Sequence, residues 1–281
     1  MKVKTTTYLF VFVLLLGLSC NSKENTMTEN HTSPKPTTNS SKPTYDVQNY
    51  LLLEENSNGG YDTLKKEVSI LRTNEIFIKN RKYIYSAIFS KENKTLSKST
   101  VEMITNNERW DTEPNIQEEI IYEYDYSAQD SIDFAPYLNS LGINRAWKKQ
   151  SRTGIIENVE KVWMHPIRDN QFVTTEVAPF PEVLLPLDIG KKWTGTINIG
   201  HGWGNWSNKS IATEYEVARR VEKQFPFSKE PINFWEVKAK SSFSFGTSHA
   251  TFLFHPKYGF AEMVYQNYLN ETITFQLISI D

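Results

Sequence analysis

Apolar and polar residues alternate with a period of two in much of the chain beyond residue 80. The alternation is clearest in seven runs, at 81–89, 120–126, 214–221, 233–239, 251–254, 260–265 and 272–280. Successive side chains of a β-strand point to opposite faces, so these runs indicate strands with one buried face. Turn-forming residues separate the strands, as in Asn58-Gly59-Gly60, at Pro226, in Pro256-Lys257-Tyr258-Gly259 and in Asn270-Glu271. The pattern predicts an antiparallel sheet of many strands.

Helical patterning is confined to short segments. Residues 133–141 predict a helix that Gly142 closes, with Ser131 as the candidate N-cap. Residues 62–72 are compatible with a helix or a strand. No repeat of 20–50 residues is evident, and the length of 45–281 suits a single β sandwich or barrel. We therefore expect one all-β domain over 45–281, a strongly curved antiparallel sheet (half-open barrel or sandwich) with minor helix.

The first twenty residues have the layout of a secretory signal peptide. Lys2 and Lys4 precede an apolar run from Tyr8 to Leu18, too short for a membrane span of roughly 20 residues. Leu16-Gly17-Leu18-Ser19-Cys20 contains the single Cys of the chain and resembles the lipobox of bacterial lipoproteins, in the relaxed form of Bacteroidetes-type bacteria. The resemblance implies cleavage after residue 19 and diacylation of Cys20. The alternative is an ordinary cleaved signal with a Cys nearby.

Residues 21–44 consist almost wholly of Asn, Ser, Thr, Lys, Glu and Pro, with Met27 the one large apolar side chain. Such a segment buries too little surface to offset the entropy of ordering it, which predicts a disordered tether. We therefore expect a signal peptide at 1–19, a lipidated Cys and tether at 20–44, and the domain at 45–281. This organisation implies a lipid-anchored protein of the bacterial outer membrane, on its periplasmic or its surface face.

Composition and the absence of known motifs argue against several classes of function. The 31 Lys+Arg and 33 Asp+Glu leave a net charge of −2, so no overall positive field favours nucleic acid. A single Cys excludes an internal disulfide framework. Aromatic residues make up 13% of the chain, which favours β structure. The sequence has no P-loop, dinucleotide fingerprint, H-E-x-x-H, EF-hand loop or G-x-S-x-G, so we expect no cofactor and lean away from an enzyme.

The segment 161–206 is the most unusual part of the chain. Pro179, Pro181 and Pro186 predict an extended crossing or an edge strand, because Pro interrupts ladder hydrogen bonding. Its motifs are Trp163-Met164-His165-Pro166-Ile167-Arg168, Pro179-Phe180-Pro181, Pro186-Leu187-Asp188-Ile189-Gly190-Lys191-Lys192-Trp193 and Gly200-His201-Gly202-Trp203-Gly204-Asn205-Trp206. The third motif and His255-Pro256-Lys257-Tyr258-Gly259 resemble stretches of uncharacterised secreted β proteins of bacteria. The first two motifs are similar to stretches of hypothetical lipoproteins of Bacteroidetes-type bacteria. That resemblance, over residues 155–281, implies an extracytoplasmic curved sheet and no particular activity.

Three functions remain open. The first is a non-catalytic binding or scaffolding protein whose concave aromatic face holds a lipid, a glycan or an envelope partner. Its candidate ligand-binding residues are Trp193, His201, Trp203, Trp206 and His165. The second is a glycan hydrolase that uses a pair of carboxylates among Glu176, Glu182, Asp188 and Glu214. The third is a purely structural surface lipoprotein.

A metal site is not expected. His165, His201, His249 and His255 do not occur at spacings that place two imidazoles together by local geometry. The expected partners are the membrane, through the N-terminal lipid, and a possible lipid or glycan ligand, with the oligomeric state left open.

Overall fold

The computed structural model describes residues 53–55, 61–63, 75–92, 94–110 and 117–281. The chain divides into two units, Met1–Ser41 and Lys42–Asp281, and every described residue lies in the second. The predicted signal peptide, Cys20 and the tether lie outside the described residues, as do Asn58-Gly59-Gly60 and most of 62–72.

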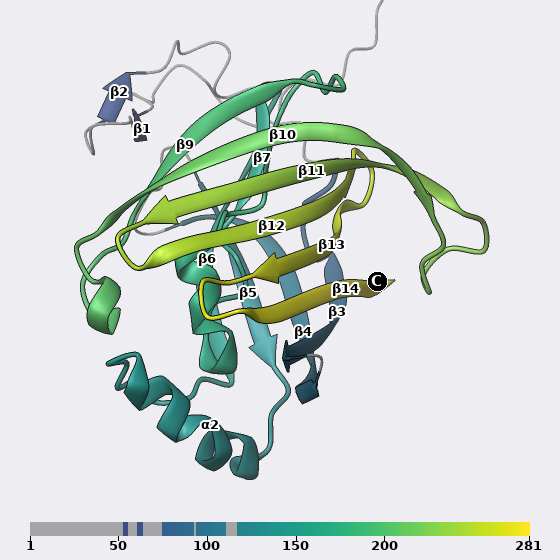
Figure 1. Cartoon of the computed structure of the whole chain (residues 1–281). Helices are drawn as coiled ribbons and strands as arrows, with labels where there is room; N and C mark the ends of the chain where they lie inside the picture. Colours follow the sequence, from purple (N-terminus) through teal and green to yellow (C-terminus); the bar gives the residue numbers. More distant parts are fainter. Residues whose placement is uncertain (1–52, 56–60, 64–74, 93, 111–116) are drawn as a thin grey trace, which may run out of the picture. The chain divides into compact units, whose positions relative to one another are not determined.

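Twelve strands of the described residues form one antiparallel sheet (Figure 1). Its order from edge to edge is β8-β7-β6-β5-β4-β3-β14-β13-β12-β11-β10-β9. The strands are β3 Lys82–Lys91, β4 Lys94–Arg109, β5 Glu118–Tyr124, β6 Gln150–Glu157, β7 Lys161–Met164, β8 Glu182–Leu184, β9 Lys192–Asn198, β10 Ser210–Lys223, β11 Ile232–Phe243, β12 Gly246–His255, β13 Gly259–Gln266 and β14 Glu271–Ile280. A separate sheet pairs β1 Leu53–Glu55 with β2 Tyr61–Thr63.

Each of the seven alternating runs overlaps a strand of the large sheet, which confirms the all-β prediction. In β3, half-buried and buried positions alternate along nearly the whole strand. Strand β4 was not predicted, because polar residues dominate its sequence and its buried positions are confined to its middle. The sheet thus contains more strands than the local periodicity predicts.

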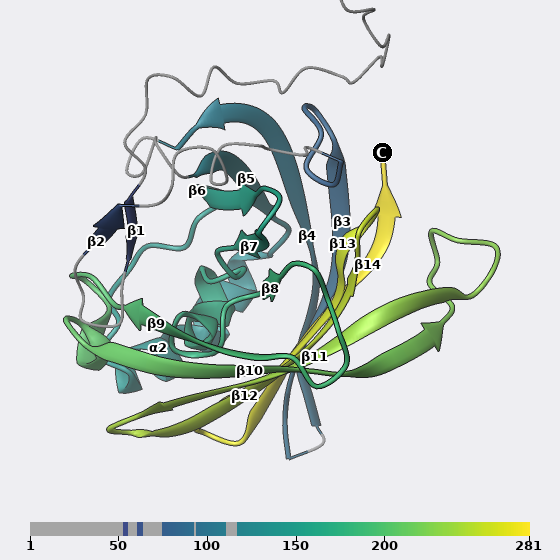
Figure 2. The same cartoon turned by 90° about the horizontal axis from the view of Figure 1, so that it is seen from above.

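The sheet curves into a half-open barrel, the first of the two predicted architectures. Strand β14 pairs with β3, so the C-terminal strand lies at the centre of the sheet order beside the first strand. Register shifts interrupt five of the strand pairings that involve β3–β5 and β10–β14, and such bulges bend and twist a sheet. Figure 2 shows the resulting curl, in which the edge strands β8 and β9 approach each other.

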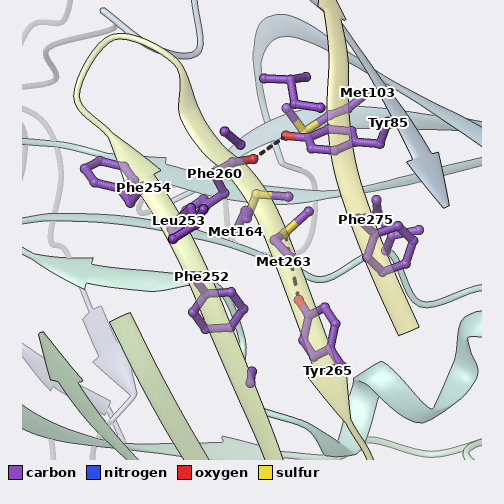
Figure 3. Packing of buried hydrophobic residues seen from close by; sticks show 14 of the residues in the cluster. Tyr85, Met103, Met164, Phe252, Leu253, Phe254, Phe260, Met263, Tyr265 and Phe275 are labelled. Atoms are coloured by element: carbon purple, nitrogen blue, oxygen red, sulfur yellow. Dashed lines mark hydrogen bonds between the residues drawn. The ribbon is translucent and has the colours of Figure 1, made fainter. Parts of the chain in front are cut away.

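Aromatic and sulfur-containing side chains fill the inner face of the sheet (Figure 3). The Tyr85 hydroxyl donates to the Phe260 carbonyl oxygen at 3.0 Å, so a polar group in the core is hydrogen-bonded. The Phe252 ring centroid lies 5.9 Å from that of Phe260 and 5.8 Å from that of Tyr265, both in edge-on geometry. Burying each such side chain contributes about 1.5–3 kcal/mol of stability. These contacts join side chains of β12, β13 and β3 in one core.

Helix α2, Ala128–Ser140, begins earlier than predicted. Its N-cap is Ser127, not Ser131: the Ser127 hydroxyl accepts from the Asp130 backbone N–H, and the Asp130 carboxylate accepts from the Ser127 N–H. The Ser131 hydroxyl instead donates to the Ala128 carbonyl. Gly142, with φ of +71°, follows the helix as predicted. None of the helices formed by the described residues has the length and apolar character needed to cross a bilayer.

A 3-10 helix lies on the concave side of the sheet. The 3-10 helix η2, Asn170–Val177, is buried along its whole length. The Phe172 ring centroid lies 5.0 Å from that of Phe275 on β14, and Asn267 donates to the Thr174 hydroxyl at 3.0 Å. The Pro-rich stretch that follows is extended and contributes the three-residue edge strand β8, as its prolines predict. Element η2 therefore takes space on the concave face that an open ligand-binding barrel would leave free.

Candidate functional site

A polar pocket of about 220 Å³ lies where β5 and β6 meet three connecting segments. Four cations line it: Arg145, Lys148, Arg152 and Arg168. Asp169 is the one carboxylate among the lining residues. The remaining lining residues are Trp203 and the hydroxyl-bearing Tyr122, Ser151 and Thr153. The lining is therefore mostly polar and strongly basic.

The pocket residues come from distant parts of the chain. Tyr122 lies on β5 and Arg152 on β6. Arg145 belongs to the connection between α2 and β6, Arg168 follows β7, and Trp203 belongs to the connection between β9 and β10. The pocket thus depends on the sheet order, which brings β5, β6 and β7 side by side.

Gly204 fixes the loop that carries Trp203. Its φ is +54°, and a Cβ at this position would lie 2.6 Å from the Leu141 carbonyl oxygen. Only Gly allows this approach of the loop to the C-terminal end of α2. Trp206, 1% exposed, anchors the same loop in the second core cluster and donates from its indole N–H to the Tyr268 hydroxyl at 3.1 Å. These contacts position Trp203 beside the pocket.

Two guanidinium groups gather at the Trp203 indole. The guanidinium carbon of Arg145 lies 3.8 Å from the ring centroid, and that of Arg168 lies 5.6 Å from it. Both distances allow attraction to the ring. Arg145 also donates from Nε to the Gly202 carbonyl oxygen at 2.9 Å. The stacked Arg145 covers the indole face, so that face is not open to a sugar ring.

Three of the four cations have a carboxylate partner. Arg168 Nη1 lies 2.7 Å from Glu176 Oε2, Lys148 Nζ lies 2.8 Å from Asp169 Oδ1, and Arg152 Nη1 lies 3.5 Å from Glu119 Oε1. For Arg145, no carboxylate of the described residues lies within ion-pairing distance. Four positive charges against three negative ones leave an excess of one positive charge at the pocket.

Burial sets the protonation of two groups behind the pocket. It raises the pKa of Glu176 above the ordinary value, an effect that the neighbouring Arg168 charge opposes. Burial, with a smaller contribution from Arg168, holds the pKa of His165 well below the ordinary value. The imidazole of His165 is therefore neutral at pH 7. It packs between the rings of Trp163 and Phe180, with centroids 4.7 and 5.3 Å away.

The structure does not bring the three predicted Trp side chains onto one open face. Trp203, 7% exposed, borders the pocket, whereas Trp206 is a core residue. Trp193 belongs to the other core cluster, where its ring stacks on Tyr215 with centroids 5.1 Å apart. His201 is exposed in a turn. Of the five predicted ligand-binding residues, Trp203 alone lines the pocket.

The basic residues of the pocket were not among the predicted site residues. Arg145, Lys148 and Arg152 fall within eight positions of one another, a local basic cluster that could have directed attention to this segment. Arg168 appears in the Trp163–Arg168 motif, but nothing local indicates that it meets Arg145.

The four acids proposed for hydrolysis occupy different environments, and none of them lines the pocket. Glu176 is paired with Arg168, and Glu182 accepts a hydrogen bond from the Trp193 indole. Asp188 and Glu214 are exposed. Within the described ranges, no group of three or more His, Cys, Asp or Glu side chains is placed to hold a metal ion.

No protein-family model and no curated protein matches the chain. Several solved structures resemble it in architecture. One is provisionally described as an exported protein with a YmcC-like fold from Bacteroides fragilis, with 9% identity, a TM-score of 0.41, and coverage of 73% of this chain and 97% of that chain. Another is provisionally described as a lipoprotein from Parabacteroides distasonis, with 8% identity, a TM-score of 0.40, and coverage of 73% and 97%.

A third similar structure is a β-barrel-like protein with a domain of unknown function from Brucella abortus. Its identity is 10% and its TM-score 0.35, with coverage of 73% of this chain and 98% of that chain. The similar proteins thus include ones described as exported or as lipoproteins. Similarity at this level does not transfer a function to this chain.

Proposed function

We propose that this chain is a lipid-anchored protein of the bacterial outer membrane that binds a polar ligand, without converting it, in the pocket beside Trp203. The observation that carries the binding function is the pocket lining, in which four cations surround a single carboxylate. That carboxylate, Asp169, is ion-paired with Lys148. General acid–base hydrolysis of a glycan uses two carboxylates, so this lining suits retention of a ligand better than hydrolysis.

The proposed ligand is polar because the pocket lining is polar, whereas at two places on the concave face aromatic side chains of the described residues already pack together. Phe134 of α2 lies with its ring centroid 5.5 Å from that of Phe89 on β3, and Phe172 of η2 contacts Phe275. An acyl chain bound at either of these two places would have to displace a packed ring. The pocket, in contrast, presents charged and hydroxyl groups.

The proposed anchor rests on Cys20 and the polar stretch behind it. Each buried methylene of an added acyl chain contributes about 0.8 kcal/mol to membrane affinity, so two or more chains hold a protein stably. If residues 21–44 form a random coil, their root-mean-square reach would be roughly 25–30 Å, which suits the proposed role as a spacer.

The anchor is tested by growing cells with labelled palmitate. We expect label in the wild-type chain and none in Cys20→Ala, and we expect globomycin to block processing. Ser22→Ala is the matched control and should be labelled like the wild type. A wild-type chain that takes up no palmitate and is released freely would refute the anchor.

The binding function is tested by native mass spectrometry of the full chain purified in detergent. We expect a retained small molecule that is lost from Arg145→Gln and kept in Arg220→Gln. Arg220 lies outside the pocket and stacks on Trp235 at 4.1 Å in the same way that Arg145 stacks on Trp203. Chemical turnover of the retained molecule by the wild-type protein would contradict a non-catalytic role.

A further inference from the structure

We propose that the pocket beside Trp203 binds the phosphate of a phosphodiester, with Arg145 as the principal ligand-binding residue. This inference rests on the proposed binding function and assigns the chemical class of its ligand. Four observations support it: the charge excess, the free donors of Arg145, the distribution of the cations and the volume of the pocket.

The excess of one positive charge at the pocket favours a ligand that carries one negative charge. Arg168, Lys148 and Arg152 each have a carboxylate partner, and the Arg145 guanidinium is left without one in the described part of the chain. Arg145 and Arg168 both approach the Trp203 ring, so two positive charges lie close together there. A bound monoanion neutralises this excess, and a phosphodiester carries one negative charge.

Arg145 retains the donors that an oxyanion needs. A guanidinium has five N–H groups, and the structure shows one of them, at Nε, donating to the Gly202 carbonyl oxygen. This bond and the stacking on Trp203 hold the guanidinium plane in place. The Nη groups can therefore form a bidentate pair with phosphate oxygens at little further cost in side-chain entropy.

The distribution of the cations favours phosphate over carboxylate. Arg145, Lys148 and Arg152 come from the stretch that leads into and begins β6, and Arg168 follows β7, so cations from two separate segments line one space. A planar carboxylate is satisfied by one guanidinium. The oxygens of a tetrahedral phosphate point in several directions and suit donors that are placed around a volume.

The volume limits the size of the ligand. Pockets for drug-sized molecules usually enclose about 300–1,000 Å³, and this pocket encloses about 220 Å³. The space suits a phosphodiester with small polar substituents, such as the phosphoglycerol part of a lipid headgroup.

The test is calorimetric titration of the full chain in detergent with glycerophosphoglycerol, inorganic phosphate and acetate. We expect saturable one-to-one binding of glycerophosphoglycerol, weaker binding of inorganic phosphate, and no measurable binding of acetate. Arg145→Gln should weaken binding of the diester by about tenfold or more, since a charge-assisted bidentate contact is lost. Arg220→Gln, the matched Arg–Trp stack outside the pocket, should bind like the wild type.

Arg145→Lys keeps the positive charge but lacks the two parallel N–H donors of a guanidinium. It is a second test in case Arg145→Gln does not fold, and circular dichroism monitors the folding of both variants. We expect its affinity to lie between those of the wild type and Arg145→Gln. Equal binding of acetate and the diester would overturn the phosphate assignment, and tighter binding of inorganic phosphate would overturn the diester. An affinity unchanged in both Arg145 variants would overturn the site.

The failures of the two proposals are distinguishable. A retained molecule that contains no phosphorus, found by native mass spectrometry, would leave the binding function standing and refute this inference. Diester binding in a chain that takes up no palmitate would leave the inference standing and refute the anchor.

Discussion

The indole N–H of Trp193 donates a 2.7 Å hydrogen bond to the Glu182 carboxylate and joins the two edges of the twelve-stranded sheet. Trp193 lies on β9, the last strand in the sheet order, and Glu182 begins β8, the first. The Lys191 ammonium adds a bond to the Leu184 carbonyl at 3.0 Å. Side chains thus close the barrel at the place where the backbone ladder ends.

Trp193→Phe should loosen this closure while it keeps an aromatic ring against Tyr215. The variant loses a hydrogen bond to a charged acceptor, so we expect the free energy of unfolding to fall by about 1.5–3 kcal/mol. Urea denaturation measures the change, and hydrogen exchange should quicken in β8 and β9. Trp163→Phe is the control, because the Trp163 indole makes no hydrogen bond to any described residue. Equal stability of the two variants would argue against closure by Trp193.

Gly204→Ala should destabilise the protein by about 2 kcal/mol or more, because a Cβ would meet backbone atoms of Leu141 and Gly142 at 2.6–2.7 Å and φ is positive. Gly200→Ala, in the same Gly-rich motif, is the control, since no atom lies within 4 Å of a Cβ there. Thermal unfolding of both variants checks the contrast. A Gly204 variant as stable as the Gly200 variant would show that the loop can move away from α2.

Glu176 should make stability depend on pH. Burial, opposed by Arg168, raises its pKa above the ordinary 4.5, so the folded protein takes up a proton at a pH where the unfolded chain remains ionised. Protonation then favours the folded state: the contribution is fully present below about pH 4.5 and is lost as the pH rises through the raised pKa.

The measurement is the difference in unfolding free energy between the wild type and Glu176→Gln, which cannot titrate. We expect the wild type to gain on the variant as the pH falls from 8 towards 4.5, by up to about 1.4 kcal/mol per pH unit within the window. A difference that stays constant, or that grows with rising pH, would contradict the raised pKa.

Tyr137→Phe should weaken the attachment of α2 to the sheet. The Tyr137 hydroxyl donates to Glu271 Oε2 at 2.6 Å, and burial, followed by the Glu271 charge, raises the pKa of Tyr137, which keeps its proton in place. Loss of this bond to a buried carboxylate should cost about 1.5–3 kcal/mol. Tyr126→Phe is the control, because the Tyr126 hydroxyl bonds to no other described residue. Chemical denaturation gives the free energy of unfolding of both variants. Equal values for the two would refute the stabilising role of the Tyr137–Glu271 bond.

Much of the fold follows from local patterns. Alternating runs predict strands because a β-strand has a period of two, and Pro179 and Pro181 indicate an edge because Pro cannot donate to a ladder. The N-cap was misplaced by four residues, although Ser127 and Asp130 stand at the spacing of a capping box. Strand β4 was missed because its exposed ends carry no alternation.

The pocket could not be predicted in the same way. Arg145, Arg168 and Trp203 are far apart in the chain, and no local pattern places their side chains in one space. The sequence does not distinguish Trp193 and Trp206 from Trp203. In the structure, Trp206 packs in a core cluster, and Trp193 packs in the other and bonds to Glu182 at the sheet edge. Residue type suggested an aromatic binding face, whereas the structure covers the Trp203 ring with a guanidinium.

The sequence by itself determined seven strands of the large sheet, several of the turns and prolines between strands, and the all-β class, because these properties depend on neighbours a few residues away. Tertiary structure alone decided that β8 and β9 are the two edges that approach each other, that η2 occupies the concave face, and that Arg145 and Arg168 lie at one indole ring. Those outcomes depend on strand order, bulges and long-range packing, which place side chains from remote segments in one space.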